Sequence, residues 1–319
     1  MELQKRIKNK ILENYTEYLY LFVQFQSEFI SGLYKRYQGV ENGNLVLYYA
    51  KIAHQDILRQ KDYDLNFDLG FKNFWENHKL INPQKHSIQK VANDTSFAKE
   101  TARRKILELI RQNVLSKKNK IIAWLPNEQH KESYNLFIHK EIEELSKLAA
   151  FVCKKIDLSI SKEEITEEIK KNFSFYWFHY LGAQLEYLRL WNKQFKDIEL
   201  IHIFLQVSNV FVSKEKKKIL SHKNLNDNSS LLKDYASTSI SATSVSDVTG
   251  IPRASCMRKL EYLTILKLIS QDRVSKRYYF IPNHTQEGLV SRKINEKVVK
   301  IFSQLFFIFI SSIEAKTSS

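Results

Sequence analysis

The sequence of 319 residues is poor in glycine and proline. It has 7 glycines and 4 prolines, where average usage gives roughly 22 and 16. Tight turns that need a positive φ mostly use glycine, which argues against a sheet-rich fold with many such turns. The closest glycines, Gly39 and Gly43, fit neither the G-x-G-x-x-G pattern nor a loop that ends in Lys-Ser/Thr. The sequence therefore predicts a helix-dominated soluble protein without a glycine-rich nucleotide site.

Patterns typical of disulfides, metal sites and nucleophilic catalysis are also missing. The two cysteines, Cys153 and Cys256, form no C-x-x-C pair, which favours buried thiols in a reducing compartment over a disulfide framework. The nine histidines show no H-x-x-x-H spacing and have no cysteine partner nearby. No G-x-S-x-G nucleophile context occurs. We expect a protein that is not an enzyme and holds no metal or cofactor.

Apolar runs of membrane-spanning length are not expected either. Residues 1–10 are polar, and no apolar signal-like segment with a cleavage site follows them. The most apolar run, Ile301–Ile313, is interrupted by Ser303 and Gln304 and is shorter than the roughly 20 residues that a membrane span needs. The sequence predicts a cytoplasmic protein with no membrane partner.

Positive charge is the property that the chain has in excess. It carries 50 Lys and Arg against 35 Asp and Glu, a formal net charge of +15. The stretch 85–120 holds ten basic and three acidic residues, and the stretch 253–277 holds seven basic and two acidic residues. Nucleic acid is the commonest partner of so basic a protein. The alternative interpretation is a solvated basic face without a partner.

The two basic stretches belong to an internal repeat of about 155 residues. The matches are Arg-Lys-Ile at 104–106 with Arg-Lys-Leu at 258–260, Val-Leu-Ser at 114–116 with Leu-Ile-Ser at 268–270, Trp-Leu-Pro-Asn at 124–127 with Phe-Ile-Pro-Asn at 280–283, and Ser87, Ile88 and Val91 with Ser244, Val245 and Val248. Long apolar segments at helical spacing precede each block. We therefore expect two repeats, 1–158 and 159–319, with coincidental matches as the alternative.

Each matched block has the pattern of a helix-turn-helix followed by a β-hairpin. In the second repeat, Gly250 forms the turn and Pro252 opens a helix. The expected hairpin follows at 268–281. In the first repeat we expect helices at 87–92 and 98–113 and a hairpin at 114–125. The turn there is expected to be three residues longer, with Asn93 or Asp94 in place of the glycine.

These blocks resemble the winged helix-turn-helix domains of bacterial transcription regulators and, more distantly, those of MarR-like regulators. The resemblance implies a mainly α fold with two small β-hairpin wings, built as a tandem duplicated winged helix-turn-helix unit with long flanking helices. MarR-like regulators use such helices as a dimer interface. Here the equivalent helices, expected at 133–156 and 287–313, are predicted to pack two halves of one chain together, giving a monomer with an internal pseudo-two-fold axis.

The function that this resemblance implies is sequence-specific binding of double-stranded DNA by a transcription regulator that acts as a single-chain pseudo-dimer on the nucleoid. The predicted contacts on the recognition helices are Lys99, Thr101, Arg103 and Arg104, and Arg253, Ser255 and Arg258 with Met257 at the position of Arg103. The predicted contacts on the wings are Lys117, Lys118, Lys120, Arg273, Lys276 and Arg277. Arginine suits guanine, and lysine on a hairpin tip suits phosphate or the minor groove.

Two other functions stay open from the sequence. A plasmid or phage replication initiator also uses paired winged helices, and a winged-helix scaffold of a chromosome-organising complex binds protein instead of DNA. The aromatic stretch 173–180 also has two interpretations: it lines a pocket for a small-molecule effector between the repeats, or it belongs to the hydrophobic core.

Overall fold

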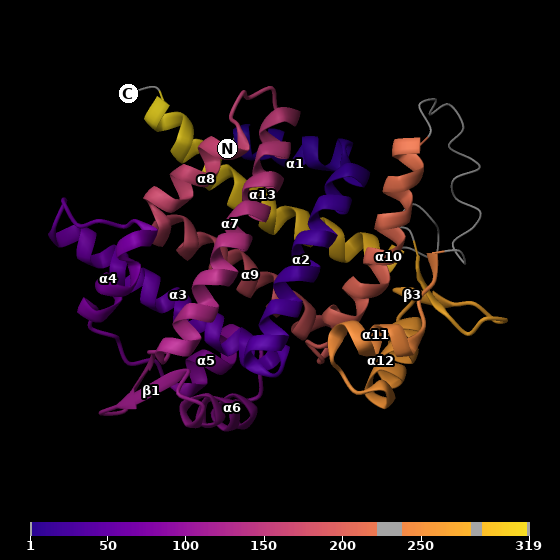
Figure 1. The fold of residues 1–319 in the computed structure, drawn as a ribbon, viewed down its shortest axis with the longest axis horizontal. Helices are drawn as coiled ribbons and strands as arrows, with labels where there is room; N and C mark the ends of the chain where they lie inside the picture. Colours follow the sequence, from indigo (N-terminus) through magenta and orange to yellow (C-terminus); the bar gives the residue numbers. More distant parts are fainter. Residues whose placement is uncertain (1, 222–237, 282–288, 318–319) are drawn as a thin grey trace.

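The computed structural model describes residues 2–221, 238–281 and 289–317, and these are mainly helical, with 13 α-helices and two small antiparallel hairpins (Figure 1). In the first half the elements are α1 (Glu2–Glu13), α2 (Tyr15–Tyr37), α3 (Val40–Tyr63), the 3₁₀ helix η1 (Phe71–Asn73), α4 (Phe74–Leu80), α5 (Ile88–Thr95), α6 (Lys99–Arg111), β1 (Leu115–Lys118), β2 (Ile121–Trp124) and α7 (Glu128–Lys155). In the second half they are α8 (Lys162–Lys171), α9 (Phe173–Phe195), α10 (Leu200–Ser221), α11 (Ala242–Thr249), α12 (Arg253–Ile265), β3 (Ile269–Gln271), β4 (Tyr278–Phe280) and α13 (Leu289–Thr317).

The order and the lengths of the elements repeat along the chain. The helices α2 and α9 both have 23 residues, α5 and α11 both have 8, and α6 and α12 both have 13. The long helices that follow the hairpins, α7 and α13, have 28 and 29 residues. In the first half, η1 and α4 precede α5. In the second half, residues 222–237, which precede α11, lie outside the described residues.

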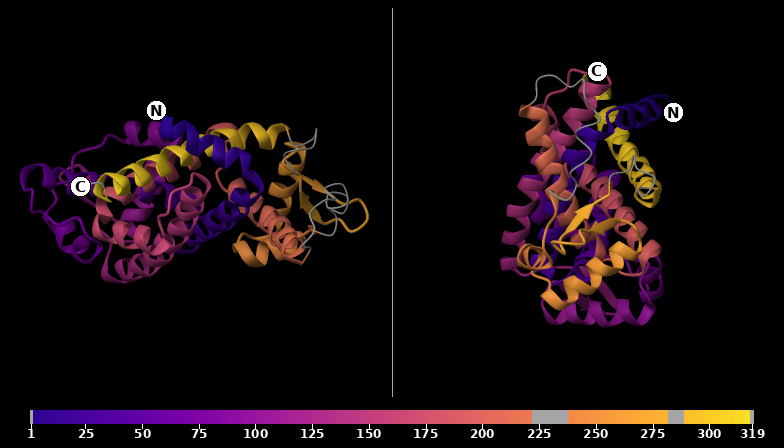
Figure 2. Two further views of the ribbon diagram at one scale, coloured as in Figure 1. Left: turned by 90° about the horizontal axis from the view of Figure 1, so that it is seen from above. Right: turned by 90° about the vertical axis from the view of Figure 1, so that its right-hand side faces the viewer.

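The two halves are interlocked through their long helices. The helix α3 packs against α9, α2 packs against α10, α1 packs against α13, and α7 packs against α8, so each pair joins the two halves. Figures 1 and 2 show α1 and α13 together along one edge of the molecule. The predicted boundary near residue 158 lies between α7 and α8, and one hydrophobic core continues across it. The division into two units therefore describes the repeat, while the core is shared.

Capping explains where the second half begins. Ser161 and Glu164 form a capping box. The Ser161 hydroxyl accepts a hydrogen bond from the Glu164 backbone N–H, and the Glu164 carboxylate accepts a hydrogen bond from the Ser161 backbone N–H. This box opens the ten-residue helix α8. The long helix, α9, begins separately at Phe173.

Aromatic side chains fill the centre of the core with a pseudo-two-fold pattern. The rings of Phe22 and Tyr187 lie 5.8 Å apart, and those of Phe29 and Tyr180 lie 6.0 Å apart, each pair joining α2 to α9. Phe22 and Tyr180 occupy equivalent places in α2 and α9. Within the aromatic stretch 173–180, four side chains are buried in the core: Phe173, Tyr176, Trp177 and Tyr180. Those four residues therefore belong to the core.

The apolar character of α13 extends beyond the run predicted from sequence. Among the described residues, Lys293–Ala315 is the one helical segment long and apolar enough to cross a membrane by length and composition. The expectation that this region is too short was therefore wrong, because it considered only Ile301–Ile313. Half of an 18-residue window of this segment is buried inside the fold.

Glu141, on α7, is a fully buried carboxyl at the contact between the two halves. Tyr180 of α9 donates a hydrogen bond to it. Burial raises the pKa of Glu141 to about 8, although the Tyr180 hydrogen bond and the charge of Arg36 act in the opposite direction. In the unfolded chain this group titrates near 4.5, so the folded protein holds its proton over a wider pH range.

We expect Glu141 to make folding stability fall as the pH rises. Its stabilising effect is complete below the unfolded pKa and is lost as the pH passes through the folded pKa, about 2 kcal/mol between pH 6 and pH 8. The variant Glu141→Gln, which is neutral throughout, should lack this loss, and the exposed Glu143→Gln should keep it. Urea unfolding at the two pH values measures the difference. Equal pH dependence in Glu141→Gln and the unchanged protein would contradict the assignment.

Candidate nucleic-acid interface

Two helix pairs, α5–α6 and α11–α12, are built in the same way. Ser87 and Ser241 cap the first helix of each pair, accepting hydrogen bonds from the backbone N–H three residues on. Each pair has a three-residue connection that begins with a left-handed residue, Ser96 with φ 58° and Gly250 with φ 74°. The expectation of a longer first turn centred on Asn93 or Asp94 was wrong, because both residues lie inside α5.

Correcting the turn also corrects the register of the repeat. At an offset of 154, Thr95 and Thr249 are equivalent, and each hydroxyl donates to the carbonyl four residues before it at 2.7 Å. Val91 therefore corresponds to the buried Val245, whereas the sequence analysis paired it with Val248, which is 51% exposed. The buried positions of the two pairs are Val91, Ala102, Ile106 and Leu109, and Val245, Cys256, Leu260 and Leu263.

The second helix of each pair exposes most of the predicted contact residues. On α6, Lys99, Arg103 and Arg104 are exposed and Thr101 is half-buried. On α12, Arg253 and Arg258 are exposed, while Ser255 and Met257 are half-buried. Three of these arginines have neighbours on the same motif: Arg103 pairs with Glu100 at 2.9 Å, Arg253 donates to the Thr243 hydroxyl at 3.1 Å, and Arg258 donates to the Ser255 hydroxyl at 3.3 Å. A pattern of basic residues on one helix face is therefore present on both.

The hairpin after α6 is short and regular. Leu115 pairs with Trp124 and Lys118 pairs with Ile121, which leaves a two-residue turn. Asn119 and Lys120 both have positive φ, at 50° and 65°, as a type I′ turn requires for the twist of a hairpin. The predicted residues Lys117, Lys118 and Lys120 are all exposed.

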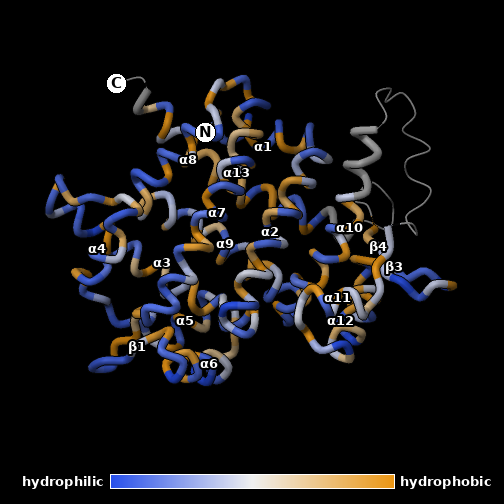
Figure 3. Tube along the Cα trace, viewed as in Figure 1, coloured by the Kyte–Doolittle hydropathy of each residue, from blue (hydrophilic) through white to orange (hydrophobic). Residues whose placement is uncertain are grey.

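The hairpin after α12 has a longer tip. Ile269 pairs with Phe280 and Gln271 pairs with Tyr278, and the intervening tip exposes Arg273, Lys276 and Arg277. A backbone bridge between Ile240 and Tyr278 adds a third segment beside the hairpin. The projecting ends of both hairpins are mostly hydrophilic (Figure 3). Both hairpins therefore carry their predicted basic side chains outward.

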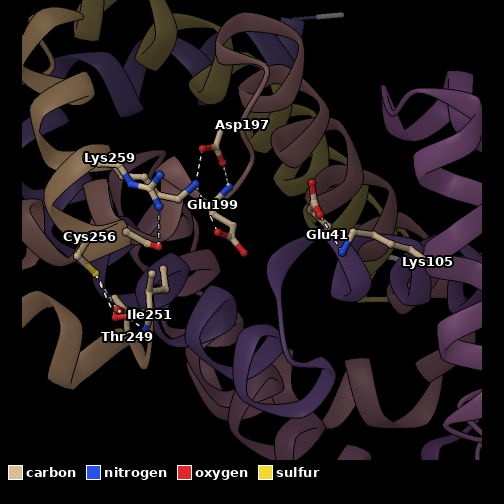
Figure 4. A network of polar contacts seen from close by, with 10 residues as sticks. Glu41, Lys105, Asp197, Glu199, Thr249, Ile251, Cys256 and Lys259 are labelled. Atoms are coloured by element: carbon tan, nitrogen blue, oxygen red, sulfur yellow. Dashed lines mark hydrogen bonds and ion pairs between the residues drawn. The ribbon is translucent and has the colours of Figure 1, made fainter. Parts of the chain in front are cut away.

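Two lysines within the basic stretches form ion pairs with carboxylates of the fold. The Lys105 ammonium of α6 lies 2.8 Å from the Glu41 carboxylate at the start of α3. The Lys259 ammonium of α12, at the equivalent place, binds the Asp197 carboxylate and lies 3.4 Å from that of Glu199, just before α10 (Figure 4). The first ion pair therefore joins α6 to the start of α3, and the second joins α12 to the segment before α10. The sequence analysis missed these acids, although Glu41 and Glu199 lie one repeat apart.

The structure places the two helix pairs in the same part of the molecule and the two hairpins apart from each other. The helices α5 and α6 and the helices α11 and α12 lie in the lower part of the molecule in Figure 1, with β1 at the lower left and β3 higher, on the right-hand side. The β1–β2 hairpin points to the lower left and the β3–β4 hairpin points to the right. No cluster of three or more His, Cys, Asp or Glu side chains suited to a metal ion occurs in the described part of the chain.

Comparison with known proteins gives no relatives. No family model, no curated protein and no solved structure matches this chain.

We expect loss of the Lys105 tie to destabilise the fold. Only 15% of the Lys105 side chain is exposed, so Lys105→Met leaves Glu41 partly buried without its cation and should lower the free energy of unfolding by about 1–2 kcal/mol. Adding Glu41→Gln should recover part of that loss. The exposed Lys99→Met on the same helix should change stability by less than about 0.5 kcal/mol. Denaturant unfolding compares them, and an equal effect at Lys99 and Lys105 would refute the tie.

Proposed function

We propose that this protein binds double-stranded DNA in a sequence-specific manner through two winged helix-turn-helix motifs in one chain, and that it regulates transcription. The observation that carries the proposal is the repetition: the same helix pair with exposed basic side chains and the same following hairpin occur twice, and α6 and α12 both lie along the lower edge of the molecule in Figure 1. A single basic helix is most often a solvated surface, whereas two equivalent ones on one edge suit two successive grooves of a duplex.

The roles of the residues follow from the geometry of a duplex. The helices α6 and α12 are the recognition helices, and their exposed Arg104 and Arg258 are suited to donate two hydrogen bonds to a guanine in the major groove. Thr101 and Ser255, half-buried at the start of those helices, suit phosphate or thymine methyl contacts. The wing residues bind the backbone or the minor groove on either side.

The two halves of the DNA site should differ in sequence. At an offset of 154, Arg103 corresponds to Met257 and Lys99 corresponds to Arg253, so the two recognition helices present different groups to the bases. The interlocked halves already supply the paired arrangement that separate winged-helix subunits achieve by dimerising. We propose one chain on one site made of two unlike half-sites, in keeping with the resemblance to winged-helix and MarR-like regulators.

The salt dependence of binding tests the function. On the order of six to ten phosphates should be contacted, so the logarithm of the association constant should fall against the logarithm of salt concentration with a slope of about −5 to −9. Fluorescence anisotropy with a labelled genomic fragment, recovered by pull-down and sequencing, measures this slope. A slope near zero, with passage through a DNA-cellulose column at moderate salt, would contradict DNA binding and favour the protein scaffold.

Substitutions separate base contacts from phosphate contacts. Arg104→Ala or Arg258→Ala should weaken binding to the recovered site by roughly 1–3 kcal/mol and have a smaller effect on random DNA, because a base contact is lost. Lys117→Ala or Lys276→Ala should weaken binding to the recovered site and to random DNA equally. Arg111→Ala, at the exposed end of α6, is the matched arginine control. Equal behaviour of Arg104→Ala and Lys117→Ala on the two duplexes would overturn these roles.

A further inference from the structure

The corner between α9 and α10, residues 192–199, touches both helix-turn-helix motifs. Its first residue, Asn192, is 6% exposed and donates from its side-chain amide to the carbonyl of Ser96 at 2.6 Å and to that of Thr95 at 3.4 Å. Those two carbonyls end α5, at the turn that leads into the first recognition helix. The second half of the chain therefore binds the turn of the first motif.

The same corner also fixes the second recognition helix. Lys196 adopts the left-handed conformation that ends α9, and the chain then turns through Asp197, whose carboxylate accepts a hydrogen bond from the Glu199 backbone N–H at 3.0 Å. Asp197 and Glu199 hold Lys259 of α12. Asn192, which binds the first motif, therefore lies five residues before Asp197 and seven before Glu199, which bind the second.

The corner between α2 and α3, residues 34–42, repeats this arrangement with the motifs exchanged. Tyr34 lies against the turn of the second motif, where a Cβ added at Gly250 would be 3.7 Å from the tyrosine ring. At the other end of the corner, Glu41 holds Lys105 of α6, and the Asn42 amide donates to the Glu108 carboxylate of α6 at 3.2 Å. Each corner thus contacts one motif through its turn and the other through its recognition helix.

The two corners also lie against each other. A Cβ added at Gly39 would be 3.9 Å from the Glu199 carboxylate, and the rings of Tyr34 and His202 lie 5.2 Å apart. The Ser31 hydroxyl and the His202 ring are 3.1 Å apart. The contacts that connect α6 to α12 are therefore made by packed helix ends. Within the described residues, this path includes no long loop.

We propose that these two corners act as a spacer that fixes the separation and angle of the two recognition helices, so that the protein selects DNA by the distance between half-sites as well as by their bases. This rests on the DNA binding proposed above. One inserted base pair moves a half-site by about 3.4 Å and turns it by roughly 35°. A rigid spacer cannot follow that movement, and one recognition helix then loses its base contacts.

The DNA test uses the recovered site with one base pair inserted or deleted between the half-sites. The unchanged protein should bind either altered duplex on the order of 100-fold more weakly, because several base contacts are lost. In the double variant Asn192→Ala/Asp197→Asn, the ratio of the affinity for the original duplex to the affinity for an altered duplex should fall to roughly tenfold or less. A purely structural role would weaken all duplexes by one factor and leave the ratio unchanged. The control Gln194→Ala, an exposed amide on the same helix, should keep the original ratio.

A second measurement needs no DNA. Nitroxide labels on Arg111→Cys and Ile265→Cys, exposed at the ends of α6 and α12, report the distance between the recognition helices by pulsed electron resonance, while both native cysteines are buried. A rigid spacer should give one narrow distribution of distances between the two labels, and the Asn192→Ala/Asp197→Asn change should broaden that distribution. The spacer would be overturned if the two proteins gave distance distributions of equal width. It would also be overturned if the unchanged protein bound the original and the altered duplexes with nearly equal affinity. Narrow distances without binding to any duplex would instead refute the proposed function alone.

Discussion

Packing between the halves is the interaction on which the other features depend. The helices α2 and α3 find their main partners in α10 and α9, which lie more than 100 residues further along the chain. Polar groups follow the same seam, since Gln206 of α10 donates to the Ser27 hydroxyl of α2 at 3.0 Å. A hydrophobic face on each long helix, with few glycines to interrupt it, makes this shared core possible. Both helix pairs and both hairpins are attached to its surface.

The way α6 and α12 pack on the shared core determines which of their positive charges face solvent. Charge on α6 and α12 divides into two classes: the exposed arginines and lysines, and the inward lysines that carboxylates neutralise within the fold. Only the first class is available to an acidic partner, whereas the second class orients the helices that present it. The two classes alternate on one helix, because positions 104 and 105 point in different directions at 100° per residue.

Local pattern predicted much of the fold, and long-range pairing accounts for the differences. Few glycines and prolines predicted the helices, and identities at an offset of 154 located the helix pairs and hairpins. The first turn was misjudged because Ser96 takes a left-handed conformation that a serine does not signal in sequence. The partners of Lys105 and Lys259, and the pairing of α2 with α10, join residues 60 or more positions apart. No periodicity within one segment specifies such contacts.

The late partners of α2 and α3 have a consequence for synthesis of the chain. When α7 has been made, at Lys155, the helices that cover α2 and α3 have not yet been translated, and α10 ends only at Ser221. At about 5–20 residues per second, the nascent chain exposes those apolar faces to solvent or to a chaperone for roughly 3–13 s. A ribosome that stalls within this interval releases a fragment with a complete helix-turn-helix and an uncovered core.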